Sequence, residues 1–219
     1  MSSTLIEPVS SMYSLQKLEH VNLDVLQLFF NELPLDPYLG DKYRYRRYSS
    51  FQVSSEQLVQ LPHQYFLQKK EYNTLLGDIR REYLELDDRL TAAEDFRKLT
   101  HDFLSAYKSL PEGTEMGIHQ IRVVSSDTMP GYPAPEGIHV DGFDLVGIFC
   151  VDRSDITGGV TYLYESRDGE PVYCTTLEPG DLLVFDDRRL LHYTSPIITS
   201  GIACGKRDVF IFTAKVATS

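Results

Sequence analysis

The stretch TTLEPGDLLVFDDRRLLHYTSPI, residues 175–197, predicts three short strands joined by two turns. Its apolar runs are separated by a Pro-Gly pair and by the charged segment DDRR, both of which are typical turn signals. About seven runs of this kind follow one another from residue 117 onward, punctuated by Gly, Pro and Asp. This density of strands and turns favours a double-stranded β-helix, that is, a jelly-roll or cupin-like core.

The first half of the chain is predicted to be more helical. Residues 22–33 and 89–110 carry apolar positions at helical spacing, whereas the alternating, tyrosine-rich residues 43–53 predict a strand. Residues 63–86 are expected to hold one or two short helical pieces. The apolar stripe of the clearest helix, 89–110, consists of Phe96, Leu99, Phe103 and Tyr107.

These patterns predict a mainly β protein with supporting helices, organised as a single domain over residues 1–219. We expect 1–115 to form mostly helical support plus a strand, and 116–216 to form the jelly-roll core with the functional site. The chain shows no internal repeat, low-complexity tract or linker that would divide it.

Composition narrows the possible partners and the compartment. A net charge of −11 argues against nucleic acid or an anionic membrane surface as a partner. The N-terminus lacks the pattern of a signal peptide, and no apolar run is long enough to span a membrane. Three cysteines without short paired spacing are expected to be reduced, so the cytoplasm is the expected location; they are Cys150, Cys174 and Cys204.

Three residues have the composition of a mononuclear metal site. His139 and Asp141 stand two apart in GIHVDGFD, residues 137–144, so a strand would point both side chains to one face. His192 returns about fifty residues later in the quoted stretch. Two imidazoles and one carboxylate on one side of an iron ion leave the opposite positions open. His192 alone could equally be a hydrogen-bonded strand histidine.

Several segments resemble the iron(II)- and 2-oxoglutarate-dependent dioxygenases, and within them the bacterial group of free L-amino-acid hydroxylases that includes isoleucine dioxygenase. The likeness covers about 43 to 213 and implies that His139, Asp141 and His192 bind the iron. It also implies that Arg207, fifteen residues after His192, binds the distal carboxylate of 2-oxoglutarate. The segments that carry it are YRRYSSF (45–51), IHQIRV (118–123), PAPEGIHVDGFD (133–144), TGGVTYLY (157–164), LEPGDLLVFDDRRLLHYTSPI (177–197) and KRDVFIFTA (206–214).

Chemistry is consistent with these implied roles. Three protein ligands leave room on iron for a chelating keto acid and for dioxygen, the expected co-substrate. A permanently charged, planar guanidinium suits the far carboxylate of 2-oxoglutarate, although Arg207 alone could form a surface ion pair with Asp208. Asp141 also argues against the halogenase variant, which lacks this carboxylate. Ascorbate is an expected stimulant.

A free amino acid presents a carboxylate and an ammonium, so its pocket should offer both charges. We expect Arg122 to bind the carboxylate and Glu136 the ammonium, with Arg47 as a rival anion binder. Phe143 is a candidate apolar wall. Each of these residues could instead have a purely structural role.

The resemblance implies hydroxylation of a C–H bond in a small free L-amino acid, giving the hydroxy amino acid, succinate and carbon dioxide. One alternative is a hydroxylase of a peptide- or carrier-bound residue. Another is a non-catalytic cupin-like metal-binding sensor, which would not need Arg207. The sequence indicates neither the carbon that is hydroxylated nor the oligomeric state.

Overall fold

The computed structural model describes residues 12–54, 57–106, 110–201 and 204–216. A seven-stranded antiparallel sheet dominates it, with the strand order β1-β9-β5-β12-β4-β2-β3. The bounds of these strands are β1 Tyr13–Lys17, β2 Arg44–Ser54, β3 Gln57–Gln60, β4 Glu115–Ser126, β5 Leu145–Ser154, β9 Asp181–Asp186 and β12 Cys204–Lys215.

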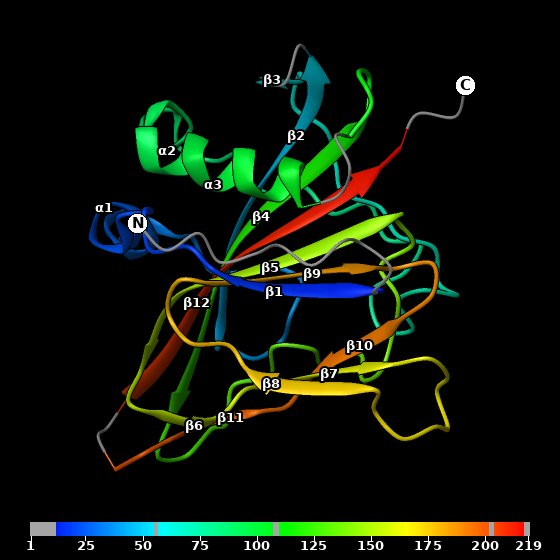
Figure 1. Ribbon diagram of the computed structural model, residues 1–219. Coiled ribbons are helices and arrows are strands. Elements are labelled where there is room, and N and C mark those ends of the chain that lie inside the picture. The colour runs from blue at the N-terminus through cyan, green and yellow to red at the C-terminus, as the bar shows by residue number, and fades with distance from the viewer. Residues whose placement is uncertain (1–11, 55–56, 107–109, 202–203, 217–219) are drawn as a thin grey trace.

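Two small antiparallel sheets lie opposite the large one. The first has the order β10-β7-β8, and the second pairs β11 with β6. Figure 1 shows both on one side of the large sheet and the helices on its other side, so the predicted jelly-roll core is confirmed. The bounds are β6 Ile156–Gly158, β7 Val160–Tyr164, β8 Tyr173–Thr176, β10 Leu191–Thr194 and β11 Ile197–Thr199.

Polar side chains cap the first turn of two helices. The side chain of Asn22 accepts a hydrogen bond from the Asp24 amide, and that of Asp87 accepts one from the Arg89 amide. Extended backbone at Ala93 divides the predicted helix 89–110 into two. The helices are α1 Leu23–Leu28, continued by the 3-10 helix η1 Phe29–Glu32, then α2 Asp88–Ala92 and α3 Glu94–Ser105.

Alternation along β12 assigns its side chains to two different layers. Phe210 and Phe212 belong to the apolar cluster shared with the helices, and the Phe212 ring stacks on Phe103 of α3 with centroids 5.0 Å apart. Val209 belongs to the second apolar cluster, between the large and small sheets. Both faces of this strand are therefore buried, which explains its nearly continuous apolar sequence.

The structure differs from the sequence expectations in several elements. No helix forms in residues 63–86, all of which are described. This stretch consists of turns and isolated bridges instead. Strands β1 and β3 were not anticipated, although both belong to the large sheet. The predicted helical position Tyr107 lies outside the described residues. No helix in the described ranges is long and apolar enough to cross a membrane.

We predict that Gly147→Ala destabilises the protein by about 1–3 kcal/mol, because overpacking a filled core displaces its neighbours. A Cβ at Gly147 would come within 2.6 Å of the Phe103 ring, which stacks on the Phe212 ring. Urea denaturation measures the loss. Gly40→Ala is the matched control, because a Cβ there meets nothing within 4 Å; equal stability of the two variants would contradict the predicted packing of α3.

Candidate metal centre

His139 and His192 are brought together by an isolated backbone bridge that belongs to none of the three sheets. The His139 amide donates to the His192 carbonyl over 3.1 Å, and the His192 amide donates back over 2.8 Å. His192 lies on β10, whereas His139 and Asp141 lie in the loop before β5 rather than on a strand as expected. The isolated bridge supplies the alignment that a strand would have given.

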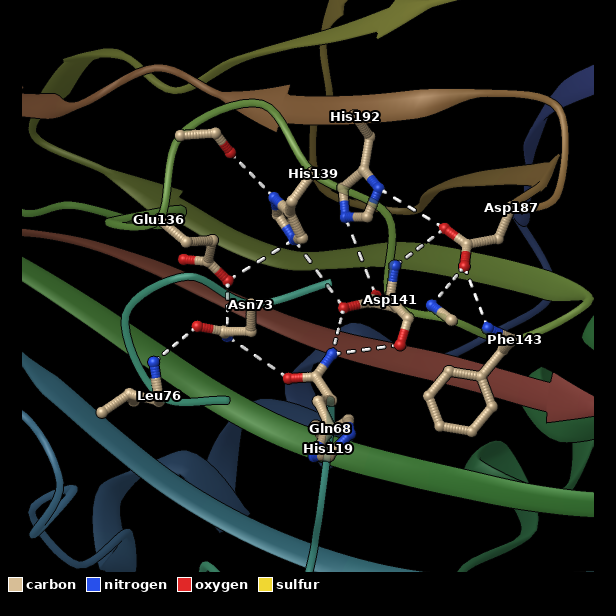
Figure 2. A network of polar contacts seen from close by, with 12 residues as sticks. Gln68, Asn73, Leu76, His119, Glu136, His139, Asp141, Phe143, Asp187 and His192 are labelled. Atoms are coloured by element: carbon tan, nitrogen blue, oxygen red, sulfur yellow. Dashed lines mark hydrogen bonds and ion pairs between the residues drawn. The ribbon is translucent and has the colours of Figure 1, made fainter. Parts of the chain in front are cut away.

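The side chains of His139, Asp141 and His192 converge on one point, as Figure 2 shows. One ligand atom from each lies within 4.8 Å of the others. The two Asp141 carboxylate oxygens lie 3.7 Å from His139 Nε2 and 3.7 Å from His192 Nε2, respectively. Two imidazole nitrogens and a carboxylate at this spacing form a donor set suited to iron(II).

The contacts of each imidazole determine which of its nitrogens can bind a metal. His139 Nδ1 donates to the Gly137 carbonyl over 2.8 Å, so its Nε2 keeps a free lone pair. Burial lowers the pKa of His192 well below its usual value and the neighbouring His139 lowers it further, which favours the neutral ring that a ligand requires. For His139, burial also opposes protonation, but the Glu136 and Asp141 carboxylates outweigh burial and raise the pKa.

A buried carboxylate, Asp187, fixes the loop that carries Asp141. Its oxygens accept hydrogen bonds from the amides of Asp141, Gly142 and Phe143 over 3.1, 2.8 and 3.0 Å. Burial, followed by the Asp141 charge, raises the pKa of Asp187 to about 7. Asp187 Oδ1 also lies 3.8 Å from His192 Nδ1. One side chain therefore lies beside the backbone of one candidate ligand, Asp141, and the ring of another, His192.

The stretch between β3 and α2 contributes polar groups that the sequence did not reveal. Gln68 Nε2 donates to Asp141 Oδ1 over 2.9 Å, and Gln68 Oε1 accepts from Arg81 Nη2 over 2.8 Å. Asn73 Nδ2 donates to Gln68 Oε1 over 3.3 Å and to Glu136 Oε1 over 3.4 Å. These contacts link Arg81 to the candidate ligand Asp141 through Gln68, and they link Glu136 to it through Asn73 and Gln68, as Figure 2 shows for the glutamate.

A cavity between the large sheet and β10 opens onto the three candidate ligands. Arg207 and Val209 of β12 and Ile148 of β5 lie on the large-sheet side, and Thr194 lies on β10. Arg207 is only 3% exposed, and its Nη2 has no hydrogen-bond partner among the described residues. An unpaired, buried guanidinium donor in the same cavity as the metal ligands fits a cofactor that carries a carboxylate.

Glu136 also lines this cavity, with Oε1 3.4 Å from His139 Nε2. Arg122 does not line it. Its guanidinium forms a two-pronged ion pair with Asp208 at 2.7 Å and contacts Asn31 of η1, on the helix side of the sheet. The structure thus places Arg122 outside the cavity in which we expected it to bind a substrate carboxylate, because its neighbours His119, Ile121 and Val123 occupy the cavity face.

Phe143 and Arg47 also lie outside the cavity lining. Phe143 packs with Tyr48, Phe66 and Tyr83, so it is not a wall of the cavity as we expected. Arg47 donates to the Glu85 carbonyl over 2.7 Å and does not serve as the rival anion binder. The arginines that do line the cavity, besides Arg207, are Arg44, Arg46 and Arg81.

A model of the 2OG-Fe dioxygenase family matches residues 27–213. The chain belongs to this family. The predicted family is thus confirmed, and this 2OG-Fe dioxygenase is a non-haem iron enzyme that uses iron(II) and 2-oxoglutarate as cofactors. The His139–Asp141–His192 donor set and the unpaired Arg207 are consistent with those two cofactors.

Two curated relatives are named as enzymes that act on isoleucine or a hydroxyisoleucine. The chain is 31% identical to a 3(1)-hydroxy-L-isoleucine 4-dioxygenase of Pantoea ananatis, over 87% of this chain and 80% of that protein. It is 22% identical to an L-isoleucine-4-hydroxylase of Bacillus thuringiensis, over 97% of this chain and 90% of the other.

Solved structures share the fold. A bsmA homolog from Methylobium petroleophilum is 26% identical, with a TM-score of 0.76 over 89% of this chain and 81% of that one. IDO from Bacillus thuringiensis is 20% identical, with a TM-score of 0.78 over 95% and 92% of the two chains. These TM-scores show that the chain shares its fold with both proteins.

We predict that Asp187→Ala weakens metal binding about 10- to 100-fold, a loss typical of removing a group that orients the ligands. Without this carboxylate, the amides of residues 141–143 lose their acceptor and Asp141 loses its fixed position. Anaerobic titration with iron(II), or with Mn(II) as a substitute, measures the change. Asp168→Ala, at an exposed turn, is the matched control; unchanged affinity in Asp187→Ala would remove Asp187 from the site.

Proposed function

We propose that this dioxygenase hydroxylates a C–H bond in the side chain of a small free aliphatic L-amino acid. One oxygen atom of dioxygen enters the substrate as a hydroxyl group. The other enters succinate as 2-oxoglutarate loses carbon dioxide, so the reaction is balanced. The observation that carries this proposal is the cavity itself, because it combines the His139–Asp141–His192 site with unpaired arginines and one carboxylate, Glu136. The two curated relatives, a 3(1)-hydroxy-L-isoleucine 4-dioxygenase and an L-isoleucine-4-hydroxylase, support the substrate class.

In this proposal His139, Asp141 and His192 hold the iron, and Arg207 holds the distal carboxylate of 2-oxoglutarate. With dioxygen, the iron and 2-oxoglutarate supply the oxidising power that replaces a C–H bond by C–OH. Arg207 suits its role because burial lowers the pKa of its guanidinium, and a carboxylate partner would offset this cost of burying the charge. Glu136, beside His139, is proposed to face the substrate ammonium.

The protein walls contribute positioning and exclusion of water. Apolar side chains from the large sheet and from the 61–87 stretch surround the site, which suits an aliphatic substrate side chain. Holding one carbon close to the iron is what selects the bond that reacts. The larger apolar members of the lining are Phe66, Leu75, Leu76, Ile121, Val123, Ile148, Val209 and Ile211.

Charge and cysteine chemistry support a small-molecule enzyme of the cytoplasm. The net charge of −11 disfavours nucleic acid as a partner. Cys150, Cys174 and Cys204 are all free thiols, as expected in a reducing compartment.

The function is tested by incubating the purified enzyme with iron(II), 2-oxoglutarate, ascorbate and pooled L-amino acids. We expect succinate to form together with a product that is one oxygen atom heavier than an aliphatic member of the pool. N-acetylated and peptide-linked forms of that amino acid should react poorly. Equal turnover of peptide-linked residues would favour a peptide hydroxylase instead, and the absence of any succinate would favour a non-catalytic sensor.

His139→Ala, Asp141→Ala and His192→Ala should each abolish this turnover while leaving the fold intact. Each removes one of the three proposed iron ligands, and these side chains line the cavity without belonging to either large apolar cluster. Succinate formation measures activity, and circular dichroism checks the fold. Activity near that of the wild type in any one variant would exclude that residue as an essential ligand.

Arg207→Ala should raise the concentration of 2-oxoglutarate needed for half-maximal rate by about a hundredfold, because a desolvated charged partner is lost. Arg207→Lys should recover only part of this loss, since an ammonium cannot donate two parallel hydrogen bonds. Metal titration of the same variants should stay close to wild type. An unchanged requirement for 2-oxoglutarate in Arg207→Ala would transfer the role to another arginine of the cavity.

A further inference from the structure

Two arginines of the cavity remain without a role once Arg207 is assigned to 2-oxoglutarate. Arg46 of β2 is 6% exposed, and Arg81, from the stretch before α2, is 1% exposed. Neither forms an ion pair with any described residue. By contrast, Arg44 of the same cavity is balanced by Asp36, with Nη2 2.8 Å from Oδ2. Burying a cation without a counter-charge raises the free energy of the folded protein. A bound anion would therefore stabilise Arg46 and Arg81.

The hydrogen bonds of these two guanidinium groups are also incomplete. Arg46 donates from Nη2 to His119 Nδ1 over 2.7 Å, and Arg81 donates from Nη2 to Gln68 Oε1 over 2.8 Å. Both partners are neutral, and the Nε of each arginine is buried without a partner among the described residues. Guanidinium donors that face a cavity in this state match a carboxylate.

Aromatic rings contact both arginines. The centroid of the Phe66 ring lies 5.3 Å from Arg46 Cζ and 4.6 Å from Arg81 Cζ. Tyr83 contacts Arg46 in the same way at 4.5 Å. These contacts fix the planes of both groups but leave their charges uncancelled, so their mutual repulsion persists until an anion binds.

His119 supports this arrangement as a neutral acceptor. Burial, and next the charge of Arg46, lower the pKa of His119 well below its usual value. Because arginine can only donate, His119 Nδ1 accepts and the ring proton resides on Nε2. Stacking on Tyr48 at 4.5 Å fixes the ring, so His119 positions Arg46.

The pair also lies at a suitable place relative to the metal ligands. Gln68 accepts from Arg81 and donates to Asp141, so one amide side chain separates the guanidinium from an iron ligand. Asn73 connects the same amide to Glu136. A positive and a negative group thus stand on either side of two neutral amides, as an α-amino acid requires.

We propose that Arg46 and Arg81 together bind the α-carboxylate of the amino-acid substrate, in place of the Arg122 expected from the sequence. This inference rests on the proposed function and adds the residues that select a free carboxylate. His119 and Gln68 act as positioning residues, because they contact the arginines rather than the substrate.

The test compares Arg46→Gln and Arg81→Gln with Arg47→Gln. Arg47 neighbours Arg46 on β2, but it binds the Glu85 carbonyl outside the cavity, so its variant is the matched control. Binding of L-isoleucine is measured by calorimetry to enzyme loaded with Mn(II) and 2-oxoglutarate, which separates binding from turnover. We expect about a hundredfold weaker binding in the two cavity variants and little change in the control. Metal and 2-oxoglutarate affinities should stay at wild-type values.

A second measurement replaces the substrate carboxylate instead of the arginines. The wild-type enzyme should bind L-isoleucinamide about a hundredfold more weakly than L-isoleucine, and this difference should largely disappear in Arg46→Gln. A merely structural role for Arg46 would not change the preference for the acid over the amide. If Arg81→Gln does not fold, Arg46→Gln and the wild-type amide comparison decide the question.

Two results would overturn the inference. One is wild-type affinity for L-isoleucine in both cavity variants, and the other is a preference for the acid that survives in Arg46→Gln. Failure of the proposed function is distinguishable from either, because the wild type would then neither bind nor hydroxylate any free amino acid of the pool. Hydroxylation of free amino acids with intact binding in both variants would retain the function and reject only the carboxylate site.

Discussion

The alternation of side chains along β4 and β12 is the constraint on which both the fold and the site depend. These two strands pair over twelve residues in the middle of the large sheet, and both of their faces are buried. On β12, Phe210 and Phe212 contact the helical layer, whereas Arg207 and Val209 face the cavity. Because successive side chains point to opposite faces, a shift of one residue would exchange these sets and bury the arginine against the helices.

The same alternation accounts for how much of the site the sequence could predict. The spacing of His139, Asp141 and His192 and the strand-borne Arg207 were readable, because their residue types are unusual in apolar runs. A period-two pattern places Gln120 and Arg122 on one face of β4, but it does not reveal which buried face holds the cavity. Arg122 instead pairs with Asp208, its direct neighbour across the β4–β12 ladder. Periodicity shows which side chains share a face of the strand, but only the packing of the layers shows which face lies against the cavity.

The residues that the sequence did not reveal come mainly from the stretch between β3 and α2. We expected one or two short helical pieces there, but the stretch is irregular and several large apolar side chains are exposed. Gln68, Asn73 and Arg81 reach the site through contacts with residues more than sixty positions away or with one another. Irregular backbone has no period from which such long-range contacts follow, so its contribution becomes visible only in three dimensions.

Charge explains why an amide stands at position 68. The iron side of the site is rich in carboxylates, whereas the opposite lining carries buried guanidinium groups, and Gln68 contacts both Asp141 and Arg81. A glutamate there would set two like charges against each other at Asp141, and a lysine could not accept the hydrogen bond from Arg81. An amide both donates to a carboxylate and accepts from a guanidinium without adding charge. Gln68 therefore lets the acidic and basic halves meet while leaving each charge free for the cation or anion that it binds.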